Sequence, residues 1–398
     1  MSLKKLSINE RNEFRRKYSD KNAAANMIYS RNALVSTNPA KTVLSGNAIV
    51  VGGPGSGKDF HVLVPNLLQT DGNYFVVDPG GIHYRDTAEM FQSAGYSVKV
   101  LDLIQPNKSN SYNPFKYMEA DDAEWFADFL LDHILNSDDE AVRAEKRSVL
   151  KAATSYVMEC CEPSERNISQ LTSLLKQCST KSGDETTGLL QADAGNICET
   201  AAELLKDLAA LEIGTVIETN NADDMELNMF ESKPMAIYVI IPIGENPYQL
   251  FSSLFIEHAM NIIRKQEWNE KHNQTVKFML NEFANLGGIG LHSIYKKKGV
   301  SFTIFIQALT QLKMLYPDDW RQLMDLGDVL VYLGYNEANT IKEMVKICNT
   351  ACGTDIRPKE ITNMNPKDCL VYIKGYGVFV DEKYPTKGHP NYSKLMGV

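Results

Sequence analysis

A glycine-rich loop that directly follows an apolar run constrains the fold of this chain most strongly. The apolar residues 48–51 lead into GGPGSGKD at positions 52–59. Seven of these eight positions fit the pattern G-x-x-x-x-G-K-[ST], whose backbone N–H groups and lysine bind phosphate oxygens. We predict that residues 61–64 continue as a helix. The sequence therefore predicts the strand–loop–helix unit of a P-loop fold, and the alternative is a glycine-rich turn that binds nothing.

The loop supplies most of the residues that we predict to bind a nucleotide. These residues are Gly52, Gly53, Pro54, Gly55, Ser56, Gly57 and Lys58. The glycines let backbone N–H groups converge, and Lys58 is expected to reach the β- and γ-phosphates. The final residue departs from the pattern, because Asp59 carries a carboxylate where a hydroxyl normally holds Mg²⁺. ATP and Mg²⁺ are thus the expected cofactors. The carboxylate of Asp59, however, argues against efficient ATP hydrolysis.

A second departure falls at a strand end where P-loop proteins carry a metal-binding carboxylate. The apolar run 276–280 is followed by Asn281 and Glu282, so an amide replaces the acid and the next Glu is kept. Glu282 is the expected catalytic residue that polarises the attacking water. Two hypotheses follow for the metal ligands Asp59 and Asn281. In one, Asp59 takes over Mg²⁺ and Asn281 avoids a second carboxylate. In the other, the site has decayed and Asp59 repels the γ-phosphate.

Polar residues also follow two other predicted strands. Asp78 ends the apolar run 74–77, and Gln307 follows the run 302–306. The C-terminal ends of parallel strands line a ligand crevice. Asp78 is therefore a candidate nucleotide-binding residue, or equally a cap for the helix after it, and Gln307 is a candidate catalytic sensor of the γ-phosphate. The basic triplet 296–298 is either a solvated surface or a contact to phosphate, on DNA or on a neighbouring subunit's nucleotide.

The order of apolar runs predicts one α/β domain that is interrupted by helices. Continuous apolar runs between 48 and 101 alternate with helical segments, which is typical of a buried parallel sheet. Helical periodicity dominates from 121 to about 211, and strand-like runs then return from 236 to a terminal hairpin. We predict an irregular, basic N-terminal segment (1–45), a P-loop domain with a mostly parallel sheet (46–118 and 231–398) and an all-helical insertion (119–230).

Charge separates the same parts of the chain. Residues 119–230 hold 24 acidic and 8 basic side chains, whereas the net charge of the whole chain is −9, so the remainder is mildly basic. The overall negative charge argues against a simple nucleic-acid binder, and no apolar run is long enough to cross a membrane. The acidic part is either a solvated helical surface or a docking site for a basic partner.

Several longer strings match one known family. The chain resembles the conjugative coupling proteins of type IV secretion, the VirD4/TraG group, in GGPGSGK (52–58), YFVVDPGG (74–81), SYNPF (111–115), NEFANLGGI (281–289) and LGYNEANT (333–340). The resemblance extends over most of residues 18–350. It implies a RecA/FtsK-like motor domain that hydrolyses ATP, assembles as a hexamer at the inner membrane and passes DNA or protein substrates to a secretion channel.

Only some of the family's functional residues are present at the matching positions of this sequence. The positions that match the family's phosphate loop, its catalytic acid and its glutamine after the strand are Gly52, Gly57, Lys58, Glu282 and Gln307. The departures are Asp59 for Thr or Ser, Asn281 for Asp, Gly80 for Lys, and Lys296 and Lys298 for the arginines of many members. Lysine lacks the two-pronged phosphate contact of arginine. The departures concentrate at nucleotide contacts, so they bear on ATP hydrolysis and leave the fold intact.

We therefore predict a coupling-protein-like motor domain that recruits DNA or protein substrates to a type IV secretion channel, with impaired ATP hydrolysis. The alternative is an inactive P-loop paralogue that docks substrates or partners. An FtsK-like DNA translocase would fit the fold but not the strings around 111–115 and 281–288.

The resemblance also implies partners and a location. The expected partners are relaxosome or effector proteins at the acidic insertion, single-stranded DNA, other copies in a homo-hexamer, and the inner-membrane secretion channel. Typical members begin with a membrane anchor that has no counterpart in these residues. We expect a cytoplasmic domain, trimmed from a longer chain or a soluble paralogue, that associates with the membrane in its full-length or assembled form.

Overall fold

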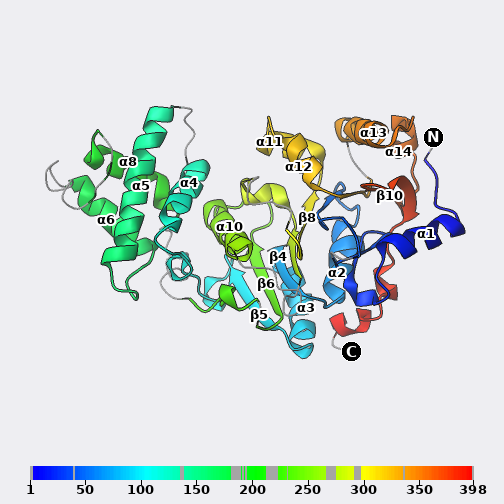
Figure 1. The fold of residues 1–398 in the computed structure, drawn as a ribbon, viewed down its shortest axis with the longest axis horizontal. Helices are drawn as coiled ribbons and strands as arrows, with labels where there is room; N and C mark the ends of the chain where they lie inside the picture. The colour runs from blue at the N-terminus through cyan, green and yellow to red at the C-terminus, as the bar shows by residue number, and fades with distance from the viewer. Residues whose placement is uncertain are drawn as a thin grey trace.

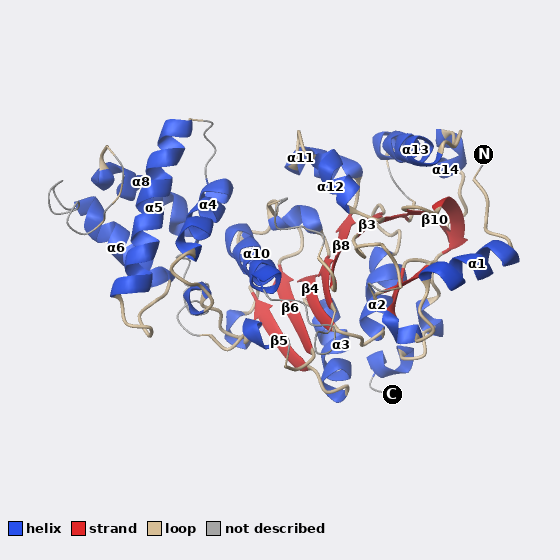
Figure 2. Ribbon diagram, in the orientation of Figure 1, coloured by secondary structure: helices blue, strands red, loops and turns tan. Residues whose placement is uncertain are grey.

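A central sheet with helices on both faces organises the computed structural model of the chain (Figures 1 and 2). The structure describes residues 3–38, 41–134, 139–180, 190, 192, 195–211, 223–230, 232–265, 275–290, 297–334 and 337–396. Within these residues, nine strands form the sheet, in the spatial order β11-β10-β9-β3-β8-β7-β4-β6-β5. Their bounds are β3 (Ala48–Val51), β4 (Asn73–Pro79), β5 (Ser97–Asp102), β6 (Met235–Ile241), β7 (Val276–Leu280), β8 (Val300–Ile306), β9 (Val329–Tyr332), β10 (Asp368–Ile373) and β11 (Gly377–Glu382).

The pairing of these strands confirms the predicted α/β fold with a mostly parallel sheet. β10 runs antiparallel to both β9 and β11, and the other neighbouring strands pair in parallel. β10 and β11 form the terminal hairpin that the sequence predicts. The strand before the phosphate loop, β3, lies between β8 and β9, and β7 lies beyond β8. The carboxyl ends of β3, β8 and β7 therefore meet at one edge of the sheet.

Alternating residues of each strand pack into two separate hydrophobic cores. Ile49 and Val51 of β3 join one core, and Ala48 and Val50 join the other, as the two-residue period of a strand requires. The helices over the first face are α10 (Gln249–Lys265), α11 (Leu309–Leu315), α12 (Trp320–Leu326), α13 (Ala338–Cys352) and α14 (Pro358–Thr362). Those over the second are α1 (Ile8–Tyr18), α2 (Val64–Leu68) and α3 (Ile82–Ser93).

Between β5 and β6 the chain builds a helical lobe at the left of Figure 1. Its α-helices are α4 (Asp122–Ile134), α5 (Glu140–Cys160), α6 (Ile168–Thr180) and α8 (Ile197–Asp207). Ion pairs link them, including Arg147 to Asp128 and Lys146 to Asp207 at 2.8 Å. These helices fall within the range predicted for the all-helical insertion, whose standing as a separate domain stays a prediction.

The N-terminal segment is more regular than the sequence suggests. The helix-like opening is present as α1, which begins with Ser7 and Glu10 in a capping box. The expectation of an otherwise irregular segment is wrong, because β1 (Asn26–Ile28) pairs antiparallel with β2 (Leu34–Ser36). Strands of three residues are too short to show an alternating pattern in a sequence. α1 packs on the C-terminal hairpin, where the ring centroids of Phe14 and Tyr376 lie 5.0 Å apart.

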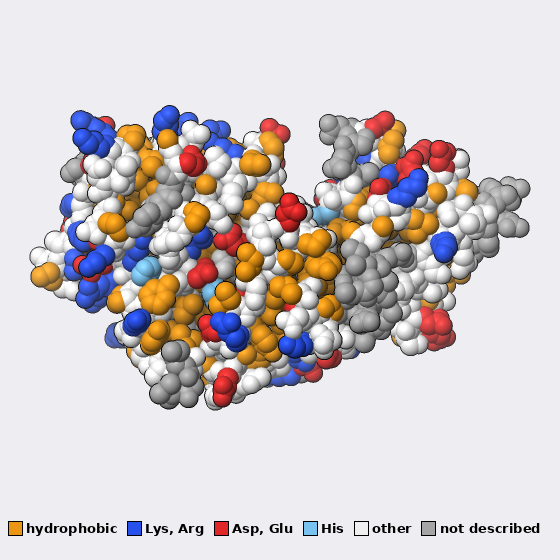
Figure 3. Space-filling view, turned by 180° about the vertical axis from the view of Figure 1, so that it is seen from behind, with side chains coloured by type: hydrophobic (Ala, Val, Ile, Leu, Met, Phe, Trp, Pro, Cys, Tyr) orange, Lys and Arg blue, Asp and Glu red, His pale blue; other side chains and the backbone are white. Residues whose placement is uncertain are grey.

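Seen from behind, the surface of the molecule shows the helical lobe as a distinct part (Figure 3). A notch separates the helical lobe from the rest, and Lys and Arg side chains gather over α13 and α14. The exposed basic residues of these two helices and the turn between them are Lys342, Lys346, Arg357 and Lys359. Among the described residues, no helix has both the length and the apolar character needed to cross a membrane.

Candidate functional site

The phosphate loop leaves β3 in the conformation that its glycines require. Gly55 and Gly57 have φ values of +73° and +83°, a left-handed region that residues with a Cβ rarely adopt. Gly52 is required for a different reason, because a Cβ there would lie 2.3 Å from Ser56 Oγ. The Ser56 hydroxyl is itself buried and has no hydrogen-bond partner among the described residues. The loop is thus a tight cradle with an unsatisfied donor inside it.

Lys58 lies folded over this cradle. Its side chain is buried, and Nζ donates a hydrogen bond to the Gly52 carbonyl at 2.8 Å. Burial lowers the pKa of Lys58, although the negative charges of Glu282 and Asp59 oppose the change. A phosphate in the cradle would offer this amine an anionic partner in place of a carbonyl. The arrangement therefore fits a phosphate group.

The two predicted catalytic residues lie together beside the loop. Gln307 follows β8 and Glu282 follows β7, and Gln307 Nε2 donates to Glu282 Oε2 at 3.0 Å. Glu282 has φ 47° and ψ 48°, which is a strained conformation for a residue other than glycine. Such strain persists where the surrounding structure holds a residue in a functional position. The sequence predicted these two positions separately, and the sheet order brings their side chains into contact.

The predicted metal ligands also meet. Asp59 begins a short π-helix, η2 (Asp59–Leu63), and receives a hydrogen bond from the side chain of Asn281 at the end of β7. About half of the Asp59 side chain, 50%, is exposed. Burial of the remainder acts to raise the pKa of Asp59. The hydrogen bond and charge of His83, with the charge of Lys58, outweigh that effect, so the pKa is lowered and the carboxylate stays ionised.

His83 is the site residue that sequence reasoning missed. It lies in the first turn of α3, almost fully buried, with Nε2 at 3.4 Å from Asp59 Oδ2. Burial acts to lower the pKa of His83, but the hydrogen bond to Asp59 and the charge of Asp78 outweigh it, so the pKa is raised. No sequence motif links His83 to another site residue by a fixed spacing. The only signal available in the sequence is its place just after the turn that follows β4.

Asp78 takes the capping role at the start of α3, and its contact with a nucleotide stays a prediction. Its carboxylate oxygens accept hydrogen bonds from the backbone N–H groups of His83 at 3.1 Å and Tyr84 at 2.7 Å. Burial raises the pKa of Asp78, although the charge of His83 opposes the change. The turn into α3 uses Gly80 and Gly81, both at positive φ. Asp78 thereby fixes the start of α3, and so the position of His83 over the loop.

The same geometry fits Mg²⁺ poorly. A cation at the carboxylate of Asp59 would share it with the imidazole of His83, 3.4 Å away. Because the pKa of His83 is raised, the ring is positively charged near its ordinary titration range and would repel a divalent ion. Asn281 offers an amide oxygen without charge. The cradle therefore suits phosphate, whereas the carboxylate predicted to hold the metal already has a side-chain partner, His83.

Two residues of the basic triplet, Lys297 and Lys298, lie at the opposite edge of the sheet. Lys296 is outside the described residues, and Lys297 and Lys298 precede β8, whereas the loop follows the other end of β3. Lys297 Nζ donates to the carbonyls of Ile263 at 2.7 Å and Arg264 at 2.8 Å, at the end of α10. These lysines are therefore remote from the phosphate loop of their own chain.

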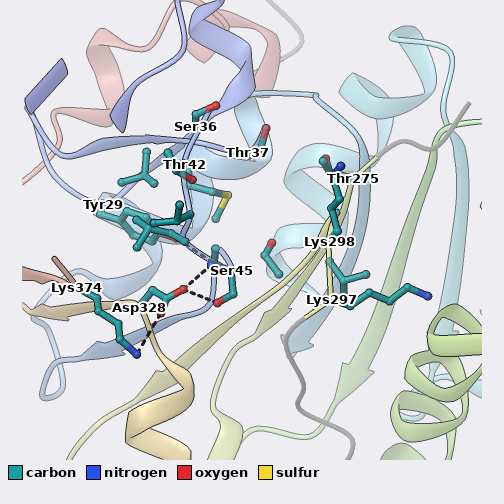
Figure 4. Close-up of a pocket in the computed structure, with 18 of the residues that line it drawn as sticks. Tyr29, Ser36, Thr37, Thr42, Ser45, Thr275, Lys297, Lys298, Asp328 and Lys374 are labelled. Carbon is teal, nitrogen blue, oxygen red and sulfur yellow. Dashed lines mark hydrogen bonds and ion pairs between the residues drawn. The ribbon is translucent and has the colours of Figure 1, made fainter. Parts of the chain in front are cut away.

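Lys297 and Lys298 border a pocket of about 500 Å³ at that edge (Figure 4). Asp328 accepts a hydrogen bond from the Ser45 hydroxyl at 2.6 Å, and Lys374 Nζ lies 4.0 Å from its other oxygen. Figure 4 shows Lys298 and Lys297 across the pocket from this group.

A family model assigns the chain. The model for type IV secretory system conjugative DNA transfer matches residues 2–203, slightly more than half of the chain. The chain belongs to this conjugative DNA transfer family. A second model, described as the TraM recognition site of TraD and TraG, matches residues 275–354 of this family member. No curated protein matches the sequence.

Solved structures share the fold of this conjugative DNA transfer protein at low sequence identity. The unbound bacterial conjugative coupling protein TrwB superposes with a TM-score of 0.72 at 15% identity, covering 96% of this chain and 92% of that one. TrwB in complex with ADP and Mg²⁺ gives 0.73 at 15% identity, with coverage of 96% and 93%. VirB4 of Thermoanaerobacter pseudethanolicus gives 0.61 at 12% identity, with coverage of 94% and 99%. The predicted resemblance to coupling proteins is confirmed.

Proposed function

We propose that the chain is a coupling-protein module that binds a nucleotide through an intact phosphate cradle and hydrolyses ATP poorly. The ion pair between Asp59 and His83 carries this proposal, because the residue at the metal position already has a cationic partner within the protein. Of the two hypotheses from the sequence, this favours a decayed metal site over a carboxylate that takes over Mg²⁺. Family membership supports a setting in conjugative DNA transfer.

The retained groups support nucleotide binding. Lys58 and the loop glycines keep the geometry of a phosphate cradle, and Glu282 and Gln307 remain in contact beside it. Structures of TrwB include complexes with a non-hydrolysable ATP analogue and with ADP and Mg²⁺. By analogy, ATP would place its phosphates in the loop of this chain. Without a metal to balance the charge of the γ-phosphate, hydrolysis would lose a main source of transition-state stabilisation.

Phosphate release by the purified protein tests this function. The assay is run with ATP and Mg²⁺, with and without single-stranded DNA, on the wild type and on Lys58→Ala. We expect turnover close to that of Lys58→Ala. The double variant Asp59→Thr/Asn281→Asp restores the family's ligands and should raise turnover. Wild-type turnover of about 1 s⁻¹ or more, abolished in Lys58→Ala, would contradict impaired hydrolysis.

A docking role is the second candidate function, and the charge of the helical lobe favours it. Residues 119–230 carry three times as many acidic as basic side chains (24 against 8). We infer that this surface recruits a basic relaxosome or effector protein. The match of residues 275–354 to a TraM recognition model supports a second relaxosome contact. We also propose that the chain assembles as a homo-hexamer, contacts single-stranded DNA and attaches to an inner-membrane channel. This domain would then lie in the cytoplasm.

Salt dependence tests the docking role. If the lobe binds through charge, capture of a relaxosome protein should weaken steeply as ionic strength rises. Charge reversal at Asp121 and Glu165 in the lobe should weaken capture further, and the matched reversals of Glu13 and Asp355 elsewhere should not. Capture that is unaffected by both salt and the lobe variants would refute it.

A further inference from the structure

The stretch that follows the last strand lies against the back of the phosphate loop and its helix. We call residues 383–391 the C-terminal clasp. Its backbone starts at the sheet edge, where Lys383 N donates to the Lys367 carbonyl at 2.8 Å. Farther along, Asn391 donates to the Leu68 carbonyl at 2.8 Å, and His389 contacts Gln69 at 3.0 Å. Figure 1 shows this red C-terminal end beside α2, which continues the helix that follows the loop.

A second lysine reaches the loop from the clasp. Lys383 is 8% exposed, and its Nζ donates to the carbonyl of Ser56 at 3.0 Å. Burial lowers the pKa of Lys383. Burying an ammonium group is costly unless its hydrogen bonds are well placed. The hydrogen bond from Lys383 to the loop must therefore offset the free-energy cost of removing its ammonium group from water.

Peptide geometry indicates what that role is. The Ser56 carbonyl and the Gly57 N–H belong to one planar trans peptide, so they point in opposite directions. A donor that fixes the carbonyl at the back of the loop therefore fixes the direction of the N–H. In the G-x-x-x-x-G-K pattern, loop N–H groups point at phosphate oxygens. The positive charge of Lys383 also polarises the peptide, which strengthens the N–H as a donor.

Two further clasp contacts hold the residues that follow Gly57. His61 Nδ1–H donates to the Tyr384 carbonyl at 2.8 Å, and a Cβ on Gly57 would lie 2.5 Å from the His61 ring. The Thr386 hydroxyl donates to the Phe60 carbonyl. In the i→i+5 pattern of η2, the backbone donor to Phe60 would come from residue 65, which is proline and has no N–H. Thr386 thus supplies a hydrogen bond that the π-helix cannot make.

From these contacts we propose that Lys383 is a positioning residue of the phosphate cradle, and that the clasp and the nucleotide stabilise each other. The inference rests on the proposed binding of nucleotide phosphates by the loop. Linkage makes the effect reciprocal: a clasp that favours the bound loop is itself held more firmly when nucleotide binds.

Isothermal titration with ATP tests the positioning role. Lys383→Met keeps the length of the side chain and removes the donor, and Lys387→Met removes the same charge from an exposed position in the clasp. We expect Lys383→Met to weaken ATP binding about tenfold, and Lys387→Met less than about twofold. Lys383→Arg, which keeps a cationic donor, should recover part of the loss. Thr386→Val gives an independent weakening of the clasp if Lys383→Met does not fold. Unchanged affinity in Lys383→Met and in Thr386→Val would overturn the proposal.

Amide hydrogen exchange separates this inference from the proposed function. In ATP-free protein, Lys383→Met should speed exchange at residues 55–58 and leave that of β6 unchanged. If the wild type binds no ATP, the proposed function fails, and exchange in the loop still decides whether Lys383 orders it. With ATP bound, exchange in the wild-type clasp should slow. Equal loop exchange in wild type and Lys383→Met would refute the positioning role.

Discussion

Removing the ion pair between Asp59 and His83 is the perturbation with the clearest expected size. The atoms Oδ2 and Nε2 lie 3.4 Å apart, which corresponds to about 5 kcal/mol of Coulomb energy at an effective dielectric constant of ~20. Because half of the Asp59 side chain is exposed, solvent screening reduces the net coupling to about 1–2 kcal/mol. The variants Asp59→Asn, His83→Gln and their combination form a double-mutant cycle that isolates this term.

Urea unfolding at pH 6 measures the cycle, because the carboxylate and the ring are both charged there. The raised pKa of His83 gives the sign: the stabilising pair is complete below the unfolded pKa and is lost as pH rises through the folded pKa. The coupling should therefore shrink from pH 6 to pH 9. Glu89→Gln serves as a matched control, since that carboxylate is exposed and lies on α3, the helix that carries His83. Additivity of Asp59→Asn and His83→Gln within about 0.3 kcal/mol would refute the assignment.

Three other predictions concern the loop, the predicted metal ligands and the buried His258 of α10. Gly52→Ala should abolish ATP binding in isothermal titration and leave the circular dichroism spectrum unchanged. The reason is that a Cβ at this position would lie 2.3 Å from Ser56 Oγ and 3.1 Å from Leu333 Cβ. Retained ATP affinity would contradict the role of the loop as a phosphate cradle. The pair Asp59→Thr/Asn281→Asp should make ATP affinity depend on Mg²⁺, and the single change Asn281→Asp should not, since His83 would still neutralise Asp59. Burial lowers the pKa of His258 to about 3, whereas the pKa of a histidine in the unfolded chain is about 6.5. The free energy of unfolding therefore keeps its full value above about pH 6.5 and falls as the pH drops toward 3, by about 2 kcal/mol at pH 5. His258→Gln should remove that part of the acid sensitivity in melts followed by fluorescence of Trp125, whose ring lies 5.1 Å away; an identical pH profile would contradict it.

The sequence predicts much of the fold because its sheet is buried. Continuous apolar runs such as Ala48–Val51 and Met235–Ile241 are buried on both faces, so hydrophobicity alone marks them as strands. The contact between Asp59 and Asn281 also follows from sequence, since the loop that ends at Asp59 follows β3 and Asn281 follows β7, and the carboxyl ends of these two strands meet at one edge.

What the sequence does not show depends on contacts between distant segments. His83 reaches Asp59 only because Gly80 and Gly81 turn the chain at positive φ and Asp78 fixes the start of α3. Lys383 reaches Ser56 across 327 positions, with no pattern in either segment to indicate the pairing. The β1–β2 hairpin is too short for its periodicity to be visible.

Dependence of ATP binding on Mg²⁺ tests the central claim most directly. Isothermal titration of the wild type with ATP is carried out once with excess Mg²⁺ and once with EDTA. Because His83 already balances the charge of Asp59, the two dissociation constants should agree within about threefold. Binding that Mg²⁺ tightens by more than about thirtyfold would contradict the account, since it would mean that Asp59 and Asn281 still hold the metal.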